Sequence, residues 1–154
     1  MRCSSGLRTF EDPVFGRLEY DNRCVWNGTV RFRPTSAEIG VAIETGGSEP
    51  GDVHRTRFRE LEERWSILAP SLARALFELW APYLAEWDAE SRSSGELPRC
   101  VEDMMRRTQL DHLAIEDGGS LTLSFGFQPE VGWDDATMSV GVSGWDVTPK
   151  SLDD

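Results

Sequence analysis

The sequence predicts an α+β fold in which one long helix lies between two blocks of β-strands. The first observation is a stripe of apolar residues spaced three or four apart, which places them on one side of a helix. The stripe consists of Phe58, Leu61, Trp65, Leu68, Leu72, Leu76, Leu79, Tyr83 and Trp87. The second observation is that the segments on both sides alternate apolar and polar residues, as strands with one solvated face do. Runs of strands that flank helices favour an antiparallel sheet in the order βββ-α-α-ββββ, with the long helix packed on one face.

The first block, residues 10–44, predicts three strands. Apolar and polar residues alternate over 17–20, 26–32 and 39–43. Asp21-Asn22 and Pro34-Thr35-Ser36 separate these runs with residue types that favour turns. The spacing indicates an antiparallel meander that buries one face.

The central stripe predicts a helix over 53–88, and Asp52 is a suitable N-cap for it. Pro70 and Pro82 fall inside this range, and each removes a backbone hydrogen-bond donor. The stripe keeps its phase across both prolines. One bent helix and two helices that meet at Pro70 therefore both fit the pattern.

The second block begins after a polar connection at 90–95. Pro98 suits the first position of a short helix, whose apolar face holds Leu97, Val101, Met104, Met105 and Thr108. Alternation returns over 113–115, 121–127 and 138–142, and Asp117-Gly118-Gly119 predicts a tight hairpin turn. Trp145 and Val147 predict a last short strand that ends at Pro149.

Length and composition favour a single domain over 1–154, with residues 1–9 and 150–154 flexible. The net charge is −11, from 16 basic and 27 acidic residues. This charge disfavours binding to nucleic acid or to an anionic membrane, because both need a positive field. The sequence has no apolar run long enough for a transmembrane helix.

Three cysteines, Cys3, Cys24 and Cys100, have no close spacing, so we expect reduced thiols rather than a disulfide framework. No apolar segment follows the first residues as in a secretory signal. Together these observations predict a cytoplasmic protein.

No motif in the sequence predicts a metal site, a cofactor or a catalytic residue. His54 and His112 are the two histidines, and neither HExxH nor CxxC spacing occurs. Cys100, His112 and Asp111 are the residue types of a Cys-His-acid site, but geometry defines such sites. We interpret Cys100, beside Val101, as a small buried apolar residue. A non-enzymatic protein is therefore favoured.

Arginines gather at the start of the predicted long helix and on a neighbouring strand. They are Arg31, Arg33, Arg55, Arg57, Arg59 and Arg64. Such a group either contacts an anion or acidic partner, or pairs with Glu60, Glu62 and Glu63. We favour pairing, because ion pairs of this kind are common on protein surfaces.

The best candidate for a binding surface lies between Glu130 and Asp154, which hold six acidic residues and one basic residue. The predicted partner-binding residues are Trp133, Asp134, Asp135 and Trp145. Aromatic residues anchor interfaces, and surrounding charges steer encounter with a partner of opposite charge. These features predict a basic protein partner. The alternative is that both tryptophans pack onto the sheet while the acids solvate its edge.

The segments Asp12-Pro13-Val14-Phe15-Gly16 and Trp26-x-Gly28-x-Val30-x-Phe32 resemble the opening of an uncharacterised bacterial family of single-domain α+β proteins. Some members of this family resemble immunity proteins of toxin systems. The resemblance implies a non-catalytic module that occludes a protein partner. Two alternatives are a small-ligand binder or enzyme with a pocket between helix and sheet, and a homo-oligomer that associates through a sheet edge and Ile67.

Overall fold

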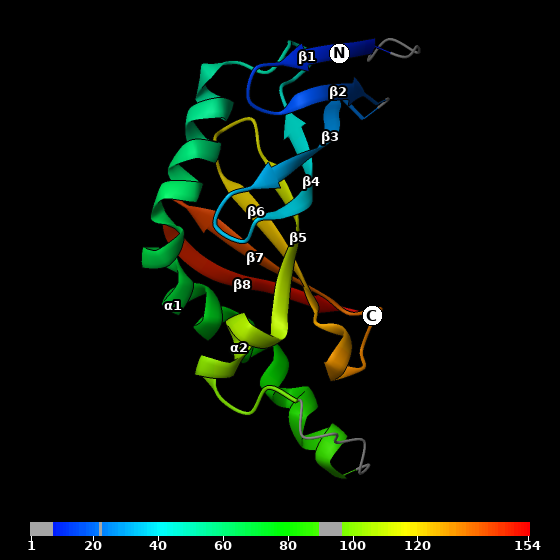
Figure 1. Ribbon diagram of the computed structural model, residues 1–154, viewed down its shortest axis with the longest axis vertical. Helices are drawn as coiled ribbons and strands as arrows, with labels where there is room; N and C mark the ends of the chain where they lie inside the picture. Colours follow the sequence, from blue (N-terminus) through cyan, green and yellow to red (C-terminus); the bar gives the residue numbers. More distant parts are fainter. Residues whose placement is uncertain (1–7, 22, 90–96) are drawn as a thin grey trace. The chain divides into compact units, whose positions relative to one another are not determined.

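The computed structural model describes residues 8–21, 23–89 and 97–154, with the backbone alone for 88 and 89. Its elements follow the order ββββ-α-α-ββββ (Figure 1). They are β1 (Arg8–Asp12), β2 (Gly16–Tyr20), β3 (Val25–Phe32), β4 (Ala37–Glu44), α1 (Asp52–Ala89), α2 (Val101–Arg107), β5 (Thr108–Ile115), β6 (Leu121–Phe127), the 3₁₀ helix η1 (Pro129–Val131), β7 (Thr137–Ser143) and β8 (Asp146–Asp153).

The α+β class and the long helix beside a mainly antiparallel sheet are confirmed. The eight strands follow one another in the sheet in sequence order. The chain divides into two compact units. Unit 1 comprises Met1–Trp65 and Asp111–Thr122, and unit 2 comprises Ser66–Leu110 and Leu123–Asp154.

Unit 1 contains one strand more than the sequence predicts before α1. β1 and β2 form a hairpin in which Arg8 pairs with Tyr20 and Asp12 pairs with Gly16. Gly16 has a φ of 71°, a conformation that glycine adopts without strain. β1 was missed because it has no alternating apolar face: of its residues, Asp12 alone is buried. The expected flexible segment 1–9 lies outside the described residues except for Arg8 and Thr9, which begin β1.

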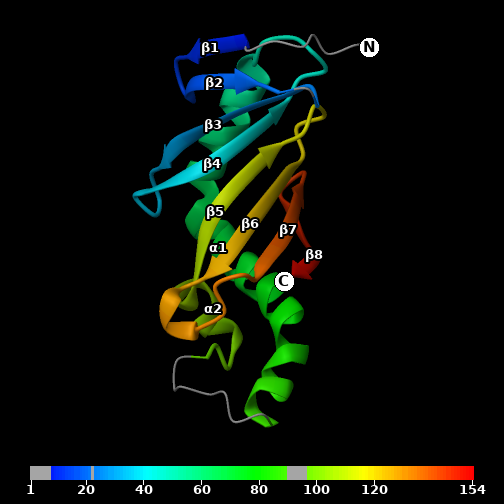
Figure 2. The same ribbon diagram turned by 90° about the vertical axis from the view of Figure 1, so that its right-hand side faces the viewer.

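One strand pair corrects the prediction of an antiparallel sheet. β4 and β5 are parallel, with register from Gly40↔His112 to Ile43↔Ile115. A parallel pair needs a crossover connection, and the chain between these strands contains both α1 and α2. The strands on the amino-terminal side, β1 to β4, are antiparallel and lie side by side (Figure 2).

The core of unit 1 forms where the first turns of α1 pack on β3 and the β1–β2 turn. The Phe58 ring contacts Phe15 at 5.3 Å and Phe32 at 6.2 Å between ring centroids. Trp26, with its indole N–H donating to Ser48 O at 2.8 Å, is buried on the same side of the sheet. These large rings pack with buried aliphatic residues such as Leu18, Ile43 and Leu61.

α1 is one helix of 38 residues, which settles the alternative left open at Pro70. Pro70 and Pro82 are both inside it and both exposed. The residues of the stripe are buried except for Trp65, Leu79 and Tyr83, which are half-buried. Trp80 lies outside the predicted stripe and is nevertheless fully buried.

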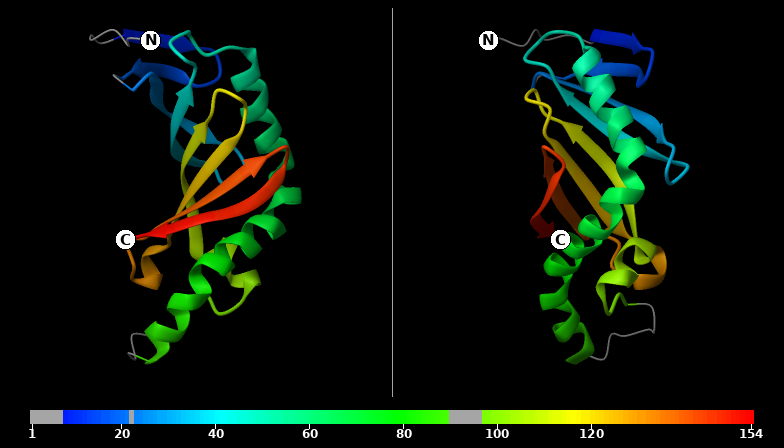
Figure 3. Two further views of the ribbon diagram at one scale, coloured as in Figure 1. Left: turned by 180° about the vertical axis from the view of Figure 1, so that it is seen from behind. Right: turned by 90° about the vertical axis from the view of Figure 1, so that its left-hand side faces the viewer.

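In unit 2, β7 and β8 form a hairpin whose turn contains Gly144 and Trp145 (Figure 3). The strand does not end at Pro149, as the sequence led us to expect, but continues to Asp153. Pro149 pairs with Val140 beside a β-bulge, a place where a strand tolerates the missing N–H. Residues 150–153, which we expected to be flexible, therefore belong to β8, and 151–153 are paired with β7.

α2 and the cysteines differ from the sequence expectations. α2 begins at Val101 rather than at Pro98, and Cys100 is its N-cap. Cys100 is exposed rather than buried, and its thiol is free. Cys24 is disulfide-bonded, so the prediction of reduced thiols is wrong for this residue.

Candidate functional site

An aromatic cluster in unit 2 holds Trp133, the first of the predicted partner-binding residues. Its indole stacks on Phe127 of β6, with centroids 5.9 Å apart and planes at 12°. Three rings of α1 complete the cluster. Their centroids lie 6.0 Å (Trp80), 5.4 Å (Tyr83) and 5.2 Å (Trp87) from that of Trp133.

The cluster has a buried base and a partly exposed outer layer. Trp80, Trp87 and Phe127 are buried, whereas Tyr83 and Trp133 are half-buried. The buried rings fix the positions of the outer ones, because aromatic pairs at these separations attract each other beyond their area of contact. Tyr83 and Trp133 thus present aromatic surface to solvent from a packed support.

Backbone contacts hold the loop that carries Trp133. The Gln128 N–H donates to Arg107 O at 2.8 Å, and its side-chain amide donates to Thr108 O at 3.3 Å. η1 follows, and Gly132 ends it with a φ of 84°. This left-handed residue turns the chain so that Trp133 returns toward α1.

Acidic residues lie close in sequence to both outer rings. Asp134 and Asp135 follow Trp133 directly, and both are exposed. Glu86 is exposed on α1 one turn after Tyr83, and Glu130 pairs with Arg107 at 3.7 Å. We call the patch made of Tyr83, Trp133, Asp134 and Asp135 the aromatic–acidic surface.

Trp145, the fourth predicted residue, lies at the opposite end of β7 from Trp133. It occupies the turn between β7 and β8 with a φ of 68°, which is rare for a bulky residue. Trp145 lines a groove of about 270 Å³ together with Arg74 and Glu78 of α1. The structure therefore brings Trp133, Asp134 and Asp135 together and places Trp145 at a separate site.

The residues weighed for a Cys-His-acid site belong to different units: Cys100 lies in unit 2, whereas Asp111 and His112 lie in unit 1. His112 on β5 lies against Gly40, where an added Cβ would meet the imidazole at 2.7 Å. Burial lowers the pKa of His112. Its ring lines a pocket of about 410 Å³ that includes Glu44 and Asn27. Among the described residues, no three His, Cys, Asp or Glu side chains gather as metal ligands would.

Sequence reasoning missed the contribution of α1 to the aromatic cluster. Trp80, Tyr83 and Trp87 are spaced three and four apart, so their common face was a readable signal. Their meeting with Trp133 was not, because it depends on the path of the chain after β6.

Two further observations concern a membrane and a second copy of the chain as partners. Across residues 8–21, 23–89 and 97–154, no helix is both long and apolar enough to cross a membrane. Ile67, on the helix face opposite the stripe, is 74% exposed.

The chain matches no protein-family model, no curated protein and no solved structure.

Proposed function

We propose that this chain is a non-catalytic protein-binding module whose aromatic–acidic surface docks a basic protein. The observation that carries the proposal is the half-buried Trp133 ring, held by buried rings and flanked by exposed Asp134 and Asp135. A tryptophan that is already fixed in place loses little conformational freedom on binding, so its contact area stabilises a complex efficiently.

Charge specifies the class of partner. Asp134, Asp135 and the nearby Glu86 give the surface negative potential, and the whole chain carries −11. Such a field accelerates encounter with a basic protein and repels an acidic one. In an immunity-type role, the module would occlude the functional face of a basic toxin, as the resemblance of its opening segment suggests.

The first test concerns association. Asp134→Lys/Asp135→Lys should slow association with the basic partner at low salt by about tenfold or more and flatten its salt dependence. The partner is first captured from a lysate of the native host at low salt and then purified, and stopped-flow mixing measures the rates. Glu38→Lys/Glu63→Lys is the matched control, because both side chains are exposed and the net charge changes equally.

Trp133→Ala provides the second arm of this test. It should raise the dissociation rate by about 30-fold, the effect of removing an interface anchor. If Asp134→Lys/Asp135→Lys associates as fast as the control variant, and Trp133→Ala leaves dissociation unchanged, the aromatic–acidic surface is not the docking site.

The compartment in which the module works bears on this proposal. The spacing of the cysteines predicts a cytoplasmic protein, and the cytoplasm keeps thiols reduced. Cys24 is disulfide-bonded, and such bonds form and persist in oxidising compartments. We therefore propose that the module meets its partner in an oxidising compartment, in place of the cytoplasmic setting that the cysteine spacing favoured.

A further inference from the structure

A second site lies in unit 1, in a pocket of about 170 Å³ between α1 and β3. The β1–β2 turn, the end of β3 and the third turn of α1 each contribute walls. The pocket is lined by Pro13, Val14, Val30, Arg31, Arg33, Phe58, Arg59 and Glu62. We call it the arginine pocket.

The arginine pocket concentrates positive charge in a strongly acidic chain. Three arginines and one glutamate line it, which leaves a local charge of +2 (3 − 1) against −11 for the whole chain. The Glu62 carboxylate accepts a hydrogen bond from the backbone N–H of Arg33 at 2.9 Å. This carboxylate is thus committed to the backbone of the loop rather than to a guanidinium group.

The arginines of this region fall into two groups. Arg57 pairs with Glu60 at 4.0 Å, as the sequence-based preference for pairing with glutamates expects. Arg55 is also paired, but with Asp12 and Asp52 rather than with one of the predicted glutamates. The three arginines of the pocket behave differently. Within the described part of the chain, no ion pair involves Arg31, Arg33 or Arg59, and all three side chains are exposed.

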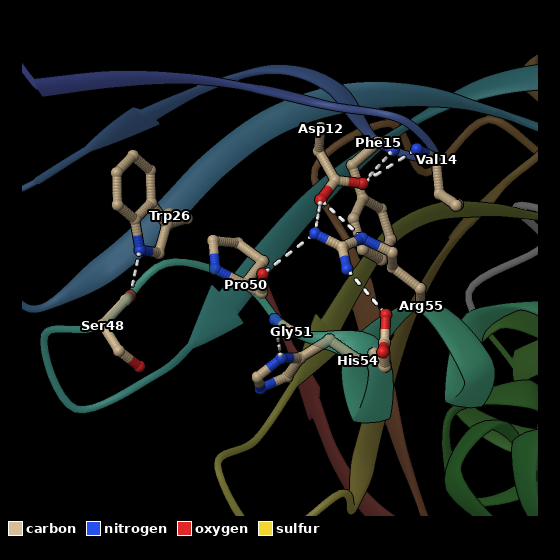
Figure 4. A network of polar contacts seen from close by, with 10 residues as sticks. Asp12, Val14, Phe15, Trp26, Ser48, Pro50, Gly51, His54 and Arg55 are labelled. Atoms are coloured by element: carbon tan, nitrogen blue, oxygen red, sulfur yellow. Dashed lines mark hydrogen bonds and ion pairs between the residues drawn. The ribbon is translucent and has the colours of Figure 1, made fainter.

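The ion pair between Asp12 and Arg55 joins two elements that line the arginine pocket, the β1–β2 turn and α1 (Figure 4). The Arg55 Nε–H donates to Asp12 Oδ1 at 2.8 Å, and Arg55 Nη2 forms an ion pair with the same oxygen at 2.8 Å. Asp12 Oδ2 accepts the Val14 N–H at 2.8 Å. The β1–β2 turn is thereby attached to α1. Phe58, buried against Phe15 and Phe32, forms the floor. The Asp12–Arg55 pair and the Phe58 ring contacts thus join the β1–β2 turn, β3 and α1, the three elements that line the pocket.

We infer that the arginine pocket binds a phosphate group in its dianionic form. Guanidinium groups match the geometry of phosphate oxygens and bind them through paired hydrogen bonds. A dianion balances the local charge of +2, whereas a carboxylate would leave one positive charge unmatched. Pockets for whole small molecules measure about 300–1,000 Å³, so this smaller one suits a single anionic group.

Amide NMR spectra of the ¹⁵N-labelled full chain test the inference. Inorganic phosphate and phenyl phosphate are titrated separately, with acetate at equal ionic strength as the reference. The expected result is a saturable shift of the Val14, Arg33 and Arg59 amides with a Kd of about 1 mM or lower for a phosphate probe. Saturation by inorganic phosphate identifies free phosphate as sufficient. Saturation by phenyl phosphate alone identifies the phosphoryl group of a larger molecule.

Variants decide whether the arginines are responsible. Arg33→Gln/Arg59→Gln should weaken phosphate binding by about tenfold or more, because hydrogen bonds between charged groups are lost. Arg23→Gln/Arg74→Gln removes the same charge from exposed positions outside the pocket and should bind as the parent does. If the double variant does not fold, Arg59→Gln alone replaces it. Absence of a saturable shift, an equal response to acetate, or unchanged binding by the pocket variant overturns the inference.

Discussion

Asp12 is the residue on which the start of α1 depends. Its side chain is fully buried, and Arg55, which pairs with it, is 19% exposed. Burial by itself raises the pKa of Asp12. The Arg55 guanidinium and the amides of Phe15 and Val14 lower it by more, so the pKa lies below its usual value and the carboxyl stays ionised at neutral pH. A buried carboxylate with this many donors fixes the β1–β2 turn far more strongly than an exposed ion pair would.

Asp12→Asn should therefore lower the free energy of unfolding by about 3 kcal/mol, because Arg55 loses its buried partner. Urea denaturation at pH 7 measures the change. Asp52→Asn is the matched control: Asp52 also pairs with Arg55, but it is exposed, and its loss should cost less than about 1 kcal/mol. Equal losses in the two variants would show that burial of Asp12 contributes nothing.

His112 gives the fold a dependence on pH. Its pKa is lowered below 6.5 by burial, so the folded protein binds this proton less readily than the unfolded chain does. The neutral ring stabilises the fold fully above pH 6.5, and that contribution is lost as the pH falls through the folded pKa.

Replacement of His112 by Gln should reduce the loss of stability between pH 7.5 and pH 5. Chemical denaturation of both proteins at each pH measures it. An identical pH dependence in the two proteins would contradict a role for His112.

Two prolines destabilise α1 locally, and the packing of its apolar stripe outweighs this destabilisation. Pro70 and Pro82 each remove a donor inside a continuous helix, where proline is strongly disfavoured. Both are exposed, so neither contributes buried apolar area. The helix nevertheless continues for 38 residues, because most helix stability in proteins comes from packing of one face.

Pro70→Ala should consequently stabilise the protein. Alanine is more favourable than proline inside a helix by about 3 kcal/mol. It also leaves the unfolded chain more conformational freedom, which offsets up to about 1 kcal/mol of that stabilisation. Thermal and urea unfolding give the net gain, expected near 2 kcal/mol. Pro129→Ala is the control, since Pro129 occupies the first turn of η1, where proline is favourable, and this change should not stabilise. A loss of stability in Pro70→Ala would show that the fold requires the proline.

Across the whole chain, the sequence predicts what depends on local periodicity. The alternation of β6 is confirmed: Leu121, Leu123, Phe125 and Phe127 are all buried. The parallel β4–β5 pair was not predictable from alternation, because either pairing direction buries the same face. β1 was missed because its residues do not alternate between buried and exposed, and Asp12 alone among them is buried.

The candidate site likewise combines features that the sequence predicts with features that depend on the tertiary fold. Trp133, Asp134 and Asp135 were identified because they are neighbours in sequence. The support from Trp80 and Trp87, and the separation of Trp145, depend on which segments meet in three dimensions. Likewise, the sequence shows that several arginines are close to one another along the chain. Which of them have no ion pair in the described structure depends on the fold.

β8 is the last strand in the sheet order, and its make-up bears on how the molecule behaves at high concentration. An outer strand offers unpaired backbone groups to any chain that meets it. Here Pro149 lacks the N–H, a bulge disturbs the ladder, and Asp146, Lys150 and Asp153 project charge from exposed positions. Strand-by-strand growth into fibres, and dimerisation by edge addition at β8, are both disfavoured by this design. The carboxy-terminal hairpin therefore disfavours self-association of the protein through this edge.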